Sequence, residues 1–81
     1  MDHTSPISLS TLTMDDQATI LAFDIGRLET TRLVSLGFTP GALVNMSQNY
    51  GRGPLIVTVR GTRVALGRGE ASKIFVRRIS E

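Results

Sequence analysis

The amino-acid sequence predicts a mostly β fold, a small five-stranded barrel with one short helix after the first strand. Apolar residues recur with a period of two in several short segments of the second half, as in half-buried strands. Links of two to six residues that contain glycine separate these segments. A single segment with helical spacing lies in the first half. Closure into a barrel is expected because it leaves no flat sheet edge exposed.

The chain of 81 residues has room for one small domain. Residues 1–6 are expected to form a flexible N-terminal tail, in which the single histidine, His3, is solvent-exposed, and residues 7–81 the domain itself. The chain has no cysteine, which excludes disulfides, thiolate metal sites and a thiol nucleophile. No apolar run approaches the ~20 residues of a membrane helix, and no signal peptide is visible. A soluble cytoplasmic protein is the expectation.

The first third of the chain is expected to supply one strand and two turns. Residues 7–12 suit an extended start and a single turn that buries Leu9 and Leu12, and residues 13–17 read as a polar turn. Residues 18–23 are a strand with too many apolar positions for clean alternation. This strand should therefore be largely buried or contain a β-bulge.

Residues 27–36 are the only credible helix, and they are expected to end at a defined stop. Threonines and a valine lower its helix propensity, so Leu33 and Leu36 must hold it against the sheet. On this interpretation Leu36→Ala should cost ~2–5 kcal/mol. Gly37 suits the left-handed residue that ends a helix, Phe38 can close over the last turn, and a Pro-Gly turn follows at 40–41.

Four further strands complete the expected sheet. A hairpin is expected about Gly61, and residues 67–72 are expected to form a turn or one 3₁₀ turn. From the residues alone the barrel is SH3-like or OB-like. The strands are expected at residues 42–50, 55–60, 63–66 and 73–79, with Val44, Met46, Leu55, Val57, Val59, Val64, Leu66, Ile74 and Val76 facing the core.

Charge is distributed unevenly along the chain. Residues 1–40 carry two arginines against five acidic residues, a net charge of −3, whereas residues 41–81 carry seven basic residues against two acidic ones, a net charge of +5. The basic half fits an anionic partner such as nucleic acid, lipid headgroups or an acidic protein surface. Because the arginines alternate with apolar residues, a solvated sheet face is the alternative.

Catalytic and metal-binding patterns are weak. There is no cysteine, and no base lies near the serines and threonines in sequence. Asp15 and Asp16 are adjacent and point apart on an extended chain, which favours a turn over paired acid-base chemistry. The acidic residues have no recognised metal-loop spacing, although a surface site for a divalent ion stays open. The segment 51–54 is glycine-rich but lacks the lysine and helix of a phosphate loop.

Binding functions remain. Nucleic-acid binding calls for aromatic residues among the arginines, and the basic half offers only Tyr50 and Phe75. Small barrels commonly present a groove or a strand edge to a protein partner. Leu43, Ile56 and Phe75 are apolar residues on the face opposite the core-facing set, so they are candidates for such a contact.

Four motifs in the chain occur together in a known family. They are Leu33-x-x-Leu36-Gly37-Phe38-x-Pro40-Gly41, Gly53-Pro54-Leu55, Val57-x-Val59-x-Gly61-Thr62-x-Val64-Ala65-Leu66 and Glu70-Ala71-x-x-Ile74-x-Val76. With these motifs the chain resembles the FeoA family, ferrous iron transport protein A, from about Leu9 to Val76. Asp16 and Gly67 depart from residues common in the family, which barely affects the fold.

The resemblance implies an SH3-like barrel without enzymatic activity, an accessory of the bacterial Feo ferrous-iron transporter, whose cytosolic part includes a G-protein domain. No cofactor is expected, although Fe²⁺ or another divalent ion could bind. Localisation would be cytoplasmic, at the inner face of the membrane through the transporter. Partner-binding residues are expected to be Leu43, Ile56, Arg60, Arg63, Phe75 and Arg77. The alternative is RNA or DNA binding through Arg60, Arg63, Arg77 and Arg78.

Overall fold

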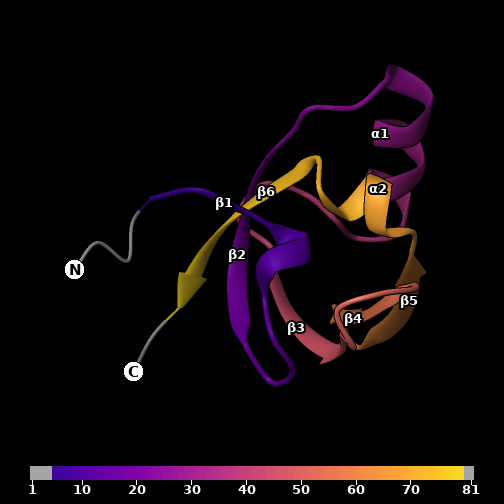
Figure 1. The fold of residues 1–81 in the computed structure, drawn as a ribbon. Helices are drawn as coiled ribbons and strands as arrows, with labels where there is room; N and C mark the ends of the chain where they lie inside the picture. The colour runs from indigo at the N-terminus through magenta and orange to yellow at the C-terminus, as the bar shows by residue number, and fades with distance from the viewer. Residues whose placement is uncertain (1–4, 80–81) are drawn as a thin grey trace.

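A computed structural model describes residues 5–79, which form a six-stranded sheet curled around one core (Figure 1). The strand order is β1-β6-β2-β3-β4-β5, and all neighbouring strands are antiparallel. The expected tail falls mostly on residues 1–4, which lie outside the described residues, as does His3. In chain order the elements are β1 (Ile7–Ser8), a 3₁₀ turn (Leu9–Thr11), β2 (Gln17–Phe23), α1 (Arg27–Ser35), β3 (Leu43–Gln48), β4 (Leu55–Val59), β5 (Thr62–Leu66), α2 (Arg68–Ala71) and β6 (Ile74–Ile79).

The mostly β architecture with a helix after the main first strand is confirmed, and two details of the prediction are wrong. A sixth strand, β1, pairs with β6, and it is only two residues long, too short for a periodic pattern to reveal. The turn expected at 67–72 contains the short helix α2, whose Ala71 is fully buried. Within residues 5–79, β1 and β5 end the sheet and are not paired with each other.

The core agrees with the alternation in the sequence. All nine core-facing strand residues expected from the pattern are buried, and so are Leu9 and Leu12 at the 3₁₀ turn. The irregular strand β2 has the expected bulge, between Ile20 and Ala22 in its pairing with β6. The polar turn also forms, since Asp16 accepts hydrogen bonds at its carboxylate from the Thr13 backbone N–H (2.7 Å) and hydroxyl (2.9 Å).

The end of α1 is a Schellman motif. The Phe38 N–H donates to the Leu33 carbonyl at 2.9 Å and the Gly37 N–H to the Val34 carbonyl at 3.0 Å. Gly37 has φ +105°, which confirms the expected left-handed residue. Leu33 and Phe38 are both fully buried, so this stop also fixes the helix against the core.

The anchor of α1 differs from the expectation. Leu33 is the only buried residue of the helix, whereas Leu36 follows its last residue and is only partly buried against the core. Truncation of Leu33 to alanine should therefore cost more stability than truncation of Leu36.

Candidate functional site

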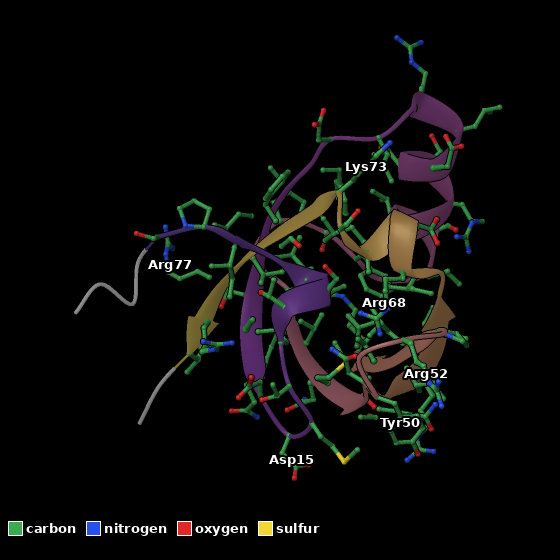
Figure 2. All side chains as sticks on the ribbon, in the orientation of Figure 1. Asp15, Tyr50, Arg52, Arg68, Lys73 and Arg77 are labelled. Atoms are coloured by element: carbon green, nitrogen blue, oxygen red, sulfur yellow. The ribbon has the colours of Figure 1, made fainter. Side chains whose placement is uncertain are left out.

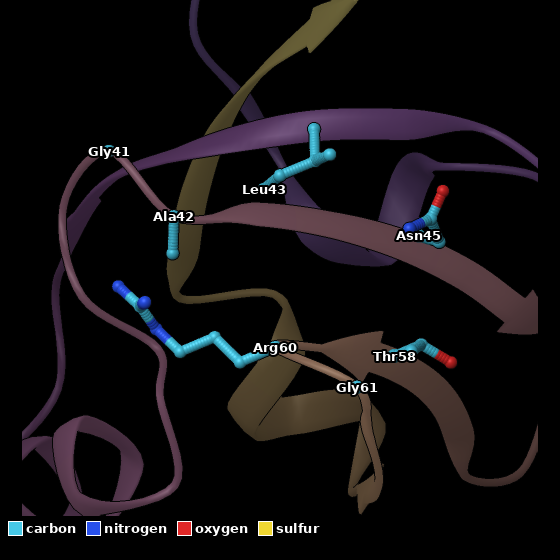
Figure 3. A pocket seen from close by; sticks show the side chains of 7 residues that line it. All are labelled: Gly41, Ala42, Leu43, Asn45, Thr58, Arg60 and Gly61. Carbon is cyan, nitrogen blue, oxygen red and sulfur yellow. The ribbon is translucent and has the colours of Figure 1, made fainter.

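An open groove lies on the outside of β3 and β4, where the turn between β4 and β5 approaches the segment after α1 (Figure 3). Its volume is about 430 Å³. Leu43 is the large apolar residue of the groove and is 47% exposed. The lining residues are Gly41, Ala42, Leu43, Asn45, Thr58, Arg60 and Gly61.

The β4–β5 hairpin brings Arg60 into this groove. Val59 pairs with Thr62, so the turn between them has two residues, Arg60 with φ +50° and Gly61 with φ +79°. Positive φ at both central residues is the requirement of a type I′ turn, whose twist matches that of the flanking strands. Arginine rarely adopts such a φ, so contacts of its side chain have to offset the backbone cost.

The Arg60 side chain extends from the turn to the end of α1. Its Nε donates to the Gly37 carbonyl at 3.3 Å and its Nη2 to the Thr39 hydroxyl at 3.1 Å. Its stem lies against Gly37 so closely that a Cβ added there would be 3.1 Å from the Arg60 Cδ. Arg60 therefore forms one wall of the groove and connects the hairpin turn to the helix stop.

A polar row continues from the groove across the outer face of the sheet. Arg63 of β5 is opposite Thr58, Thr58 is opposite Asn45, and Asn45 is opposite Gln17. The Gln17 amide donates to the Asn45 side-chain carbonyl at 2.7 Å. Arg63, at the end of this row, is exposed. It lies beside the groove because its neighbour Thr58 lines the groove.

The six expected partner-binding residues do not form one cluster. Leu43, Arg60 and Arg63 lie at or beside the groove, whereas Arg77 is separated from Leu43 by Thr19 of β2. Half-buried Ile56 and Phe75 lie at opposite ends of the sheet, because Ile56 pairs with β3 and β5 and Phe75 with β1 and the end of β2. In Figure 2 Arg77 lies beside β1 and β6, away from Arg52.

Other arginines of the basic half have partners of two kinds. Arg78 contacts the Asp16 carboxylate at 3.4 Å, which partly neutralises its charge. The Thr13 backbone hydrogen bond, with smaller contributions from the Thr13 hydroxyl and Arg78, lowers the pKa of Asp16 despite its partial burial. Arg68 donates to the neutral Asn49 side-chain oxygen at 2.8 Å, so its charge is not compensated there.

Asn49 fixes the loop between β3 and β4. Its amide nitrogen donates to the carbonyls of Ser10 (3.2 Å) and Leu12 (2.7 Å), and its oxygen accepts from the Gly51 N–H at 2.9 Å. The expectation of a strand-to-strand loop at 51–54 is confirmed. Tyr50, 69% exposed, and Arg52 project from this loop (Figure 2).

Carboxylates are scattered over the part of the chain that the structure describes. No group of three His, Cys, Asp or Glu residues lies close enough to hold a metal ion within residues 5–79. A second hollow, of about 340 Å³, includes Glu29 and Glu70 next to Lys73, and Glu70 forms an ion pair with Arg32. Neither α1 nor α2 has the length and apolar character needed to span a membrane.

The fold and groove define a small SH3-like β module that resembles solved FeoA proteins. An iron uptake regulatory protein (FeoA) has a crystal structure with TM-score 0.86 and 32% identity, covering 93% of this chain and all of that one. The zinc-bound FeoA of Stenotrophomonas maltophilia, described as a procaryotic SH3 domain protein, gives TM-score 0.76 and 33% identity over 86% of this chain and 88% of that one.

The sequence comparisons lead to the same family. An Fe(2+) transport protein A of Methanocaldococcus jannaschii is 34% identical over 61 residues, 75% of this chain and 73% of the relative. The FeoA domain matches residues 7–78, and the chain belongs to the FeoA family. Membership of this family supports a role in ferrous iron transport. A manganese-dependent transcriptional repressor, 17% identical with TM-score 0.83, shares the fold alone and is matched over 43% of its length.

Proposed function

We propose that this protein is a non-enzymatic accessory of ferrous iron uptake that binds the cytosolic part of the Feo membrane transporter and regulates it. The observation that supports a binding role most directly is the groove itself, which is lined both by Leu43, a leucine that is 47% exposed, and by Arg60. An apolar contact with a polar rim is the usual composition of a protein interface. Regulation requires that the module bind one state of the transporter more tightly than another.

Titration calorimetry tests this proposal with the cytosolic G-protein domain of the same organism's transporter, with and without guanine nucleotide. Saturable, nucleotide-sensitive binding is expected. Leu43→Glu should abolish it, because a carboxylate would replace the exposed apolar side chain of the groove. The matched control is Leu28→Glu, which makes the same change at a leucine that is 84% exposed and belongs to α1, a helix that contributes no residue to the lining of the groove.

Two outcomes would contradict the proposal. If the G-protein domain does not bind in any nucleotide state, it is not the partner of this protein. If Leu43→Glu and Leu28→Glu weaken binding equally, the groove is not the contact surface, because the substitutions would then act through the net charge of the protein.

The nucleic-acid alternative loses support from the side-chain contacts. Of its four arginines, Arg78 is paired with Asp16, while Arg60, whose guanidinium donates to the neutral oxygens of Gly37 and Thr39, keeps its charge at the groove. The remaining two, Arg63 and Arg77, lie on β5 and β6, which are separated in the sheet by three strands. A continuous cationic track for a phosphate backbone is therefore not formed by these residues.

A further inference from the structure

The outer edge of β5 is an open strand edge. Within residues 5–79, β5 hydrogen-bonds to β4 and to no other strand. Three of its five residues, Thr62, Arg63 and Ala65, are exposed. An exposed strand edge presents backbone donors and acceptors in the pattern that a further strand would pair with.

The hairpin register identifies which backbone groups face outward. In a hairpin closed by a two-residue turn, the closing pair Val59 and Thr62 exchanges both ladder hydrogen bonds, and such pairs then alternate along the strands. The N–H and C=O groups of Arg63 and Ala65 are accordingly directed away from β4. No backbone hydrogen bond outside the helices and strands of residues 5–79 involves either residue.

Basic residues are concentrated on β5 and on the segments that flank it in the chain. Residues 50–69 contain four arginines and no acidic residue. Arg63 is the second residue of β5 and is exposed. Arg60 precedes the strand and Arg68 follows it, with their guanidinium groups directed to Gly37 and Thr39 and to Asn49, respectively. Arg52 belongs to the loop before Leu55, and Leu55 pairs with Leu66 at that same end. Within residues 5–79 no carboxylate forms an ion pair with these four arginines.

The hydrogen bonds of Arg60 and Arg68 leave their charges uncompensated, because their acceptors are neutral oxygens. A second copy of the same edge would bring like charges together, which disfavours self-pairing. A strand carrying glutamate or aspartate would instead gain opposite-charge pairs across the new ladder. Apolar residues alternating with the acidic ones would cover Val64, which is 8% exposed.

We propose that the outer edge of β5 binds an extended segment of a partner protein, in which acidic and apolar residues alternate, by adding it to the sheet as a further strand. The inference rests on the proposed function, because the segment would belong to the transporter's cytosolic part. The edge adjoins the groove, since the Thr58 that is opposite Arg63 also lines the groove. A five-residue strand of about 17 Å would match the length of β5.

The direct test uses two synthetic ten-residue peptides, one alternating glutamate with valine and the other lysine with valine. Both are titrated into the ¹⁵N-labelled full chain and followed by NMR and amide hydrogen exchange. The glutamate peptide should shift the Arg63 and Ala65 amides and slow their exchange at least tenfold, and the lysine peptide should not. Raising NaCl from about 0.05 to about 0.5 M should weaken binding severalfold, because the charges are exposed.

Two variants separate backbone pairing from charge. Ala65→Pro removes an outward-directed N–H that the fold does not use, so it should abolish peptide binding while the protein stays folded. Arg63→Glu should weaken binding of the glutamate peptide at least tenfold. This second variant still tests the inference if the proline variant fails to fold. Its matched control, Arg27→Glu, makes the same change at an exposed residue of α1 and should leave binding within twofold.

Other outcomes overturn the inference. Shifts confined to the groove, or equal binding of the glutamate peptide to Ala65→Pro and to the unmodified chain, would exclude strand addition. A ten-nucleotide uridine RNA that shifts the β5 amides at lower concentration than the peptide would assign the edge to nucleic acid. A dimer that Ala65→Pro dissociates would assign it to a second copy. If the transporter domain binds Ala65→Pro normally but not Leu43→Glu, the proposed function stands and this inference fails.

Discussion

Replacing Leu33 by alanine should destabilise the protein more than any other truncation in α1. Leu33 is fully buried and is the only buried residue of the nine-residue helix. Loss of its burial and the cavity left behind cost ~2–5 kcal/mol for a leucine at such a site. The better helix propensity of alanine offsets only a few tenths of this amount. For a chain of this size the total free energy of unfolding is on the order of 4–12 kcal/mol, so the variant loses a large fraction of it.

Urea denaturation measures this loss, with the free energy of unfolding extrapolated to water and the slope m compared between variants. Leu28→Ala is the matched control, because it makes the same change in the same helix at a side chain that is 84% exposed. It should change stability by less than about 0.5 kcal/mol. Leu36→Ala, partly buried, should fall between the two. A Leu33→Ala loss below about 1 kcal/mol, or one equal to that of Leu28→Ala, would refute the packing of α1 described above.

Two further changes test the helix stop and the polar turn. Gly37→Ala should lower the free energy of unfolding by about 1–3 kcal/mol in urea denaturation, because φ is +105° there and the new Cβ meets Arg60. The control Gly69→Ala should be neutral or stabilising, because nothing lies within 4 Å of its new Cβ and its φ is not positive. Equal effects of the two substitutions would contradict the left-handed stop. Asp16→Asn should lower stability at pH 7, where the native carboxylate accepts from Thr13. Because the pKa of Asp16 is lowered in the folded protein, the difference in the free energy of unfolding between Asp16→Asn and the unmodified chain should be largest above the ordinary aspartate pKa of about 3.9. This difference should disappear as the pH falls through the lowered pKa of the folded protein. A difference that persists at low pH would show that the loss of stability has another cause.

The sequence predicts the fold where local patterns and burial agree. The alternating strands, the bulged β2 and the stop at Gly37 each follow from residues close together in the chain. The extended start and the turn at residues 7–12 are confirmed, but the prediction misses the pairing of β1 as a sixth strand, because two residues carry no periodicity and the contact with Val76 and Phe75 is long-range. It also misses α2, because Gly67 and Gly69 lower helix propensity while burial of Ala71 stabilises the short turn of helix.

The candidate site is less accessible from sequence than the fold. The alternation predicts that Leu43, Arg60 and Arg63 lie outside the core, which the structure confirms, but their grouping depends on the register of three strands. The contacts of Arg60 with Gly37 and Thr39 span 23 and 21 residues, which no local pattern encodes. One available signal was the valine-arginine-glycine-threonine sequence at 59–62, because a two-residue hairpin turn there requires positive φ at Arg60.

The contacts of the arginines also decide what the net charge of the basic half means. A formal charge of +5 suggests a polyanion partner when it is spread evenly, but the structure divides it. Arg78 is paired with the Asp16 carboxylate just before β2. Within residues 5–79 no carboxylate pairs with Arg63 on β5, a strand that also has open backbone groups, or with Arg52, Arg60 and Arg68 in the segments that flank β4 and β5 in the chain. Phosphate recognition needs only the charge, while an acidic strand uses both the charge and the exposed edge. The coincidence of the two features on β5 therefore favours a protein partner over a nucleic acid.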